Sequence, residues 1–224
     1  MNNQIPESYS NLKNVLDVHS IFYTIQGEGP YAGHPAIFIR LAGCNLQCPN
    51  CDTDYTSKRI AYSVSELATI VDGLGELHNC LLVVITGGEP LRQAATIDLI
   101  EQLIVWGMVV QIETNGMYSI ADLPEETTIV CSPKTSRIHE SLLNNPAVHF
   151  KYVVRESEVD ENGLPSLVLG KKVTMQKPKG MIWLQAEDQK DEEKNRKNLR
   201  YVAELCVRYG YRFSVQLHKL GGLE

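Results

Sequence analysis

The 224-residue sequence has no long hydrophobic run and no excess of positive charge. No stretch approaches the roughly 18 consecutive apolar residues of a membrane span, and polar residues rather than a secretory signal follow Met1. The formal net charge of -6 argues against a protein that binds nucleic acid regardless of sequence. We therefore expect a cytoplasmic protein with a small-molecule substrate, no membrane association and no direct nucleic-acid partner.

Internal repeats and low-complexity segments are absent too, and the length suits one well-packed core, so we expect a single domain over residues 1–224. Short β-rich runs alternate with helical patterns, which is typical of parallel strands joined by crossover helices. Helices are predicted from a capping box at Ser63 toward Leu77, over 97–106 and over 199–209. The predicted strands are residues 36–41, 81–85, 109–112, 128–131, 150–154, 181–185 and 212–217.

Cysteine is present in an unusual cluster, because Cys44, Cys48 and Cys51 lie within eight positions. Three closely spaced thiolates can hold three irons of a four-iron cluster and leave the fourth iron open to a small molecule, which indicates catalysis. Zinc is the second interpretation, since zinc sites usually combine Cys-x2-Cys pairs with a fourth ligand. A disulfide is less favoured, because three clustered cysteines cannot pair among themselves.

Polar and glycine-rich segments follow the predicted strands, where parallel barrels gather their chemistry. Residues 86–90 read Thr-Gly-Gly-Glu-Pro, and glycines there let the backbone approach a ligand closely. Arg40 lies in an otherwise apolar strand just before Cys44, where a bound anion would balance its charge. Residues 26–30, Gln-Gly-Glu-Gly-Pro, can be read simply as a polar hairpin loop.

Together, the Cys-x3-Cys-x2-Cys spacing and the Gly-Gly-Glu-Pro run of residues 87–90 resemble the radical S-adenosylmethionine (SAM) enzymes. That resemblance implies an α/β fold, an incomplete TIM-like βα barrel of about six mainly parallel strands with few helices. It also implies a [4Fe-4S] cluster on Cys44, Cys48 and Cys51, and SAM that binds the open iron and is cleaved to a 5′-deoxyadenosyl radical. The Gly-Gly-Glu-Pro loop would meet the methionine amino group of SAM.

Within that superfamily, residues 22–44, 51–54, 113–116, 132–134 and 216–219 resemble the 7-carboxy-7-deazaguanine synthases. The resemblance implies a carbon–nitrogen lyase of queuosine and 7-deazapurine biosynthesis, which serves tRNA modification. The substrate would be 6-carboxy-5,6,7,8-tetrahydropterin, and the product 7-carboxy-7-deazaguanine with loss of ammonia. A homodimer and a flavodoxin-type electron donor are implied as well.

The same resemblance implies residue roles, with Glu28 on the aminopyrimidine edge of the substrate and Thr53 as a ligand of Mg²⁺. Two positions depart from the family pattern, because Asn50 often has an aromatic counterpart and Ala186 a proline. The implied SAM contacts are Asn50, Cys51, Asp52, Gly88, Ser132, Pro133, Lys134, Gln185, Ala186, Glu187 and Asp188. The implied substrate contacts are Ile25, Gln26, Gly27, Glu28, Arg40, Thr86, His218 and Glu224.

Two alternative functions remain open from the sequence. A glycyl-radical-enzyme activating enzyme would share the cysteine loop, but the Gln-Gly-Glu-Gly-Pro segment and the Asp52-Thr53 pair would then lack a purpose. A non-catalytic zinc-binding module would use the same cysteines for structure. The brown colour of an iron–sulfur protein would separate the synthase and the activating enzyme, which both carry a cluster, from a colourless zinc-binding module.

Overall fold

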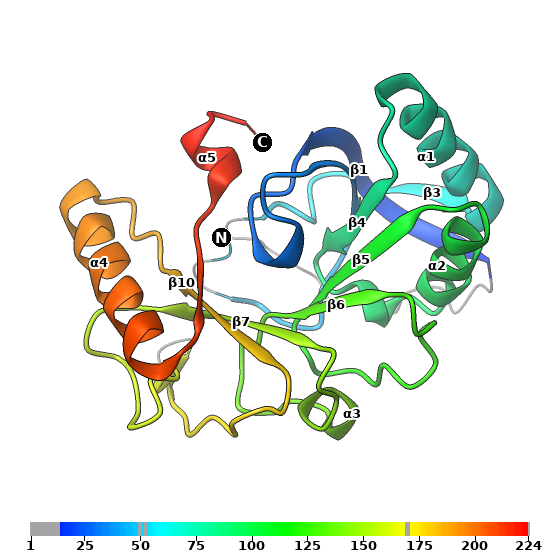
Figure 1. Cartoon of the computed structure of the whole chain (residues 1–224). Coiled ribbons are helices and arrows are strands. Elements are labelled where there is room, and N and C mark those ends of the chain that lie inside the picture. The colour runs from blue at the N-terminus through cyan, green and yellow to red at the C-terminus, as the bar shows by residue number, and fades with distance from the viewer. Residues whose placement is uncertain (1–13, 49–50, 52, 169–170, 224) are drawn as a thin grey trace.

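The computed structural model describes residues 14–48, 51, 53–168 and 171–223. These residues form a nine-stranded sheet in the order β11-β10-β7-β6-β5-β4-β2-β1-β3 (Figure 1). Seven neighbouring strands run parallel, which confirms the predicted incomplete βα barrel. They are β2 (Pro35–Leu41), β4 (Leu82–Gly87), β5 (Val109–Thr114), β6 (Thr128–Cys131), β7 (His149–Val154), β10 (Met181–Ala186) and β11 (Arg212–Ser214).

Two strands at one edge run antiparallel and were not predicted. β1 (Val15–Ile25) pairs with β2 on one side and with β3 (Ile60–Ser63) on the other. The loop between β1 and β2 contains the 3₁₀ turn η1 (Gly29–Tyr31), and hydrogen bonds from Gln26 N to His34 O (2.8 Å) and from Gly33 N to Gln26 O (2.7 Å) close it. Residues 26–30 therefore lie in a hairpin loop.

The long helices follow the predicted signals. α1 (Val64–His78) begins at the capping box, in which the Ser63 hydroxyl accepts from Glu66 N and the Glu66 carboxylate accepts from Ser63 N. α2 is Ala95–Val105, and α4 (Glu192–Tyr209) ends at Gly210, whose φ of 70° suits glycine. α4 starts earlier than predicted. Its first half is charged and solvated, so it lacks the apolar spacing from which the second half was predicted. No helix in the described ranges is long and apolar enough to cross a membrane.

Shorter elements complete the described chain. They are η2 (Pro90–Arg92), α3 (Glu140–Leu143), the two-stranded ribbon β8 (Leu167–Val168) with β9 (Lys171–Lys172), and α5 (Leu217–Leu220). The predicted strand 212–217 ends at Ser214 instead, so His218 and Lys219 lie in α5 and not in a strand. In Figure 1 α5 lies beside the loop that joins β1 to β2.

Strand alternation separates a core face from a polar face. In β2, Ile37, Ile39 and Leu41 are fully buried in the core, whereas Phe38 and Arg40 face a cavity. The core face is covered by α1 and α2, which lie together in Figure 1 and supply Leu67, Val71, Leu99, Ile100 and Leu103. The opposite face is left for polar side chains.

Candidate active site

A cavity of about 990 Å³ lies at the carboxyl ends of the parallel strands. Residues from β2, β4, β5, β7 and β10 and from the loops that follow them line it. Both signs of charge are present, which suits a ligand with several polar groups. The charged lining residues are Arg40, Lys134, Lys151, Arg155, Lys190, Glu28, Glu113, Glu158, Glu187 and Asp188.

The cavity gathers most of the side chains expected from the sequence. The expected cofactor and metal residues that line it are Cys44, Cys48, Cys51, Thr53, Gly88, Ser132, Pro133, Lys134, Gln185, Ala186, Glu187 and Asp188. Of the expected substrate residues, Ile25, Gln26, Glu28, Arg40, Thr86 and His218 also line it. Gly27 does not line it, and Asn50, Asp52 and Glu224 lie outside the described residues.

The three cysteines lie at one wall of the cavity. Burial, with smaller contributions from the nearby Glu89, Cys48 and Cys51, raises the pKa of the Cys44 thiol to about 11, although a hydrogen bond from Leu46 N lowers it. Among the described residues, no set of three His, Cys, Asp or Glu side chains has converged into a metal-ion site. The fit to a cluster therefore rests on donor chemistry, because three thiols on one cavity wall are the ligands that iron–sulfur clusters use.

The two glycines at the end of β4, Gly87 and Gly88, bring the following loop into contact with the start of the cysteine loop. A Cβ on Gly88 would lie 1.8 Å from the carbonyl oxygen of Gly43, and one on Gly87 would lie 2.2 Å from that of Leu41. The backbone N–H groups of Gly88 and Glu89 donate to Leu41 O (3.2 Å) and Gly43 O (2.9 Å). The glycines are thus required by packing between the two loops, a reason that the sequence alone did not indicate.

Glu89, in the same loop, points away from solvent and is fully buried. Its carboxylate accepts from the Thr114 hydroxyl (2.8 Å), Asn115 N (2.7 Å) and Leu91 N (3.1 Å). Burial raises the pKa of Glu89 to about 7, although these hydrogen bonds lower it. Since the Asn115 amide donates to Asn45 Oδ1 at 2.7 Å, Glu89 also supports the residue next to Cys44.

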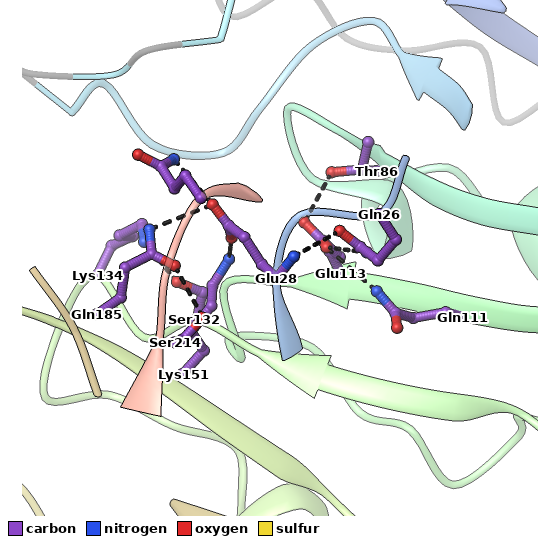
Figure 2. Close-up of polar contacts among 11 residues, drawn as sticks. Gln26, Glu28, Thr86, Gln111, Glu113, Ser132, Lys134, Lys151, Gln185 and Ser214 are labelled. Atoms are coloured by element: carbon purple, nitrogen blue, oxygen red, sulfur yellow. Dashed lines mark hydrogen bonds and ion pairs between the residues drawn. The ribbon is translucent and has the colours of Figure 1, made fainter. Parts of the chain in front are cut away.

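A second carboxylate, Glu28, receives donors from three elements (Figure 2). Lys151 donates to Oε2, and Gln185 (3.2 Å) and Gln216 (2.8 Å) donate to Oε1. Burial would raise the pKa of Glu28, but the Lys151 ammonium and the hydrogen bonds hold it below its usual range. Glu28 is therefore an ionised group within the cavity wall. Ser214 donates to Gln185 Oε1 at 3.3 Å and extends the network to β11.

A third carboxylate, Glu113, lies on β5 beside the hairpin loop. Gln26 (3.1 Å) and Gln111 (3.2 Å) donate to its Oε1, and the Thr86 hydroxyl donates to Oε2 at 3.3 Å (Figure 2). The Gln26 side chain also accepts from the backbone N–H of Glu28 at 3.1 Å. Gln26 thus links the Glu113 carboxylate to the backbone of Glu28.

The C-terminal segment spans two loops of the site. Leu217 N donates to Gly27 O at 3.2 Å, and Lys219 Nζ lies 3.3 Å from Asp188 Oδ2. A Cβ on Gly27 would lie only 1.9 Å from Nδ1 of His218, so the histidine ring packs directly on this glycine. The segment therefore connects the hairpin loop with residues 185–188.

Two of the expected residues, Thr53 and Glu187, differ in their surroundings. Thr53 reaches the cavity, whereas the next residue, Asp54, accepts from Thr56 N (2.9 Å) and Ser57 N (3.1 Å). Arg155 donates through two nitrogens to Glu187, at 2.8 and 2.9 Å. A Thr53 hydroxyl is an oxygen donor of the type that Mg²⁺ prefers. The Glu187 carboxylate is already paired.

Lys151, Glu113 and Gln216 were not among the expected site residues. One signal could have found Lys151, because it is a charged residue within the apolar strand predicted over 150–154, the feature that singled out Arg40. Glu113 and Gln216 stood in segments used for the family resemblance, but only the folded structure brings them to Gln26 and Glu28.

Comparisons with known proteins agree with this geometry. Residues 38–129 match the family model described as Radical SAM superfamily. A 7-carboxy-7-deazaguanine synthase from Rhodospirillum rubrum is 38% identical, over 92% of this chain and 91% of the relative. Its counterpart from Rickettsia prowazekii is 37% identical, over 93% and 89%. The crystal structure of QueE from Escherichia coli matches with a TM-score of 0.69 and 25% identity, covering 94% of this chain and 99% of that one.

Proposed function

The chain belongs to the 7-carboxy-7-deazaguanine synthase family of radical SAM enzymes, and we propose that its cavity performs that family's ring contraction. The substrate is 6-carboxy-5,6,7,8-tetrahydropterin, and the products are 7-carboxy-7-deazaguanine and ammonia. One observation carries the assignment: the three thiols and the polar network of Glu28 and Glu113 line the same cavity. A zinc-binding module would not need the polar network. The relatives are named 7-carboxy-7-deazaguanine synthase, which does not favour a glycyl-radical-enzyme activating enzyme.

The enzyme needs three bound groups, a [4Fe-4S] cluster, SAM and Mg²⁺, and the residues at the cavity suit each of them. Cys44, Cys48 and Cys51, which line the cavity, would hold the [4Fe-4S] cluster, and Thr53 would contribute to a Mg²⁺ site. When bound, the cluster and SAM supply one-electron chemistry that removes a hydrogen atom from the substrate, and Mg²⁺ supplies positive charge. SAM would be held by Cys51, Gly88, Ser132, Pro133, Lys134, Gln185, Ala186, Glu187 and Asp188, together with Asn50 and Asp52.

The chain's own side chains bind and orient the pterin. Glu28 is ionised and accepts from an N–H of the aminopyrimidine, because a carboxylate is an acceptor. Arg40 lies with its guanidinium 5.0 Å from the ring centre of Phe22, which fixes a cation where it can receive the substrate carboxylate. The Phe22 and Phe38 rings stack at 5.3 Å and make an apolar wall that excludes water.

Other contacts follow from the loops that these residues share. Ile25, Gln26 and Thr86 line the cavity beside Glu113, and His218 lines it from the C-terminal segment. Gly27 acts indirectly, through the packing of His218 on it. Glu224 is proposed as a further substrate contact through its carboxylate. Together, these contacts would hold the substrate in one orientation near the three cysteine thiols before reaction.

The wider setting is also part of the proposal. A single domain over residues 1–224 is supported by the nine-stranded sheet that the described residues form. A homodimer, a flavodoxin-type electron donor and a cytoplasmic location follow from the family resemblance. The reducing cytoplasm suits the cluster, because its cysteine ligands must remain thiolates.

An anaerobic assay tests the function directly. Cluster-loaded protein with reductant, SAM, Mg²⁺ and the tetrahydropterin is expected to release 7-carboxy-7-deazaguanine, identified by mass. A Cys48→Ala variant is the matched control, because it removes one thiol and leaves the substrate network of Glu28 intact. Absence of product from a cluster-replete parent protein would refute the substrate assignment.

A further inference from the structure

A buried ion pair connects the hairpin loop to the middle of β7. Lys151 is 7% exposed and Glu28 is 9% exposed, and the ammonium donates to Glu28 Oε2. Gln185 and Gln216 hold the other oxygen, so three donors from three elements fix the carboxylate plane. A carboxylate has about four acceptor sites, which leaves capacity for one further donor.

Strand geometry explains why a lysine is found here. Along β7, Phe150 and Tyr152 enter the hydrophobic core, whereas Lys151 and Val153 line the cavity. An ammonium in that wall would be strongly destabilising without a counter-charge, and the carboxylate across from it has the same need. Each member of the pair therefore requires the other, although 123 positions separate them.

We propose that Lys151 is a positioning residue of the reaction, which holds the Glu28 carboxylate charged and correctly oriented to accept an N–H of the substrate heterocycle. The inference rests on the proposed function, since it is the pterin that provides the N–H donor. Lys151 acts through Glu28, and Gln185 and Gln216 complete the orientation. Without the ammonium, burial favours a protonated carboxyl group, which offers the ligand a hydroxyl instead of a charged acceptor.

A purely structural ion pair is the alternative, and three variants separate it from a positioning role. Lys151→Met removes the charge and keeps most of the side-chain volume. Lys151→Arg keeps the charge and tests rescue. The double variant Lys151→Met with Glu28→Gln removes both charges, so it should recover the stability lost in Lys151→Met but not the substrate affinity. Lys197→Met, at an exposed lysine of α4, is the matched control.

The experiment uses cluster-loaded protein with SAM. Substrate Kd is measured by equilibrium dialysis without reductant, kcat and KM are measured with reductant, and thermal unfolding is followed in parallel. Lys151→Met should raise Kd and KM about 10- to 100-fold, the loss that removing a hydrogen bond to a charged group produces. The kcat and the affinity for SAM should be unchanged, and Lys151→Arg should recover part of the affinity.

Each outcome has a distinct meaning. A Lys151→Met protein with lowered thermal stability but unchanged Kd overturns the inference while the function stands. Recovery of affinity in the double variant overturns it too, and this variant serves if Lys151→Met alone does not fold. If the parent protein neither binds nor converts the pterin, the proposed function fails, and the inference falls with it.

Discussion

The guanidinium of Arg92 donates a hydrogen bond of 2.7 Å to the backbone carbonyl of Cys44. The next residue, Gln93, donates to the carbonyls of Ala42 (3.1 Å) and Asp17 (3.0 Å). Side chains of η2 and of the residue that follows it therefore hydrogen-bond to the backbone at the start of the cysteine loop and stabilise it. Cluster retention should depend on these side chains, although neither of them is a ligand.

Replacing Arg92 with Met should weaken retention of the cluster. The substitution removes the donor to Cys44 and keeps an unbranched side chain, so the start of the loop becomes less constrained. Iron loss to a chelator, followed by bleaching of the visible absorbance, should be about tenfold faster, because a hydrogen bond from a charged group contributes about 1.5–3 kcal/mol. Arg200→Met, on the exposed face of α4, is the control and should match the parent protein.

Replacing Gly88 with Ala should separate the two loops. The new Cβ would meet backbone atoms at 1.8 Å, which cannot rotate away as a side chain can. Purified protein should therefore hold less iron after reconstitution and unfold at a lower temperature. Gly73→Ala is the matched control, since no atom lies within 4 Å of its Cβ and alanine in an exposed helix adds up to about 1 kcal/mol of stability. Equal iron content in both variants would contradict the packing argument.

The parallel strands could be predicted from the sequence because they are nearly continuous apolar runs. β1 was missed because it is not a continuous apolar run: Asp17, His19 and Ser20 interrupt its apolar residues, and it pairs antiparallel at the side of the sheet. The structure places residues of the cysteine and Gly-Gly-Glu-Pro motifs at the strand ends beside the cavity. The pairing of Lys151 with Glu28 depends on how distant strands meet, and residue spacing carries no such information.

Replacing Gly27 with Ala should weaken substrate binding through His218. The added methyl group would occupy the place of Nδ1, and the imidazole is a side chain that can move away. The pterin KM should rise about tenfold, on the order of one lost hydrogen bond, while thermal stability changes little. In the Gly27→Ala, His218→Ala double variant, the two effects should not add, because both act on one ring. Additive losses would place Gly27 in direct contact with substrate.

Replacing Glu89 with Gln should remove a pH dependence of stability in the cluster-free protein. The folded-state pKa of Glu89, about 7, lies above its ordinary value near 4.5, so its favourable contribution is complete below about pH 4.5 and is lost as pH rises through about 7. Unfolding free energies from denaturant titrations at a series of pH values should show the parent protein losing on the order of 3 kcal/mol over this window, beyond any change in the variant.

Below about pH 4.5, where the parent protein keeps the full contribution of Glu89, the variant itself should be the less stable of the two. An amide offers one acceptor oxygen, whereas the Glu89 carboxylate receives Asn115 N on one oxygen and Thr114 and Leu91 N on the other, so a buried donor loses its partner at a cost of about 1–3 kcal/mol. Every other titratable group is common to both proteins and cancels in the difference. Parallel pH profiles for the two proteins would mean that Glu89 stays ionised, with its three donors outweighing its burial.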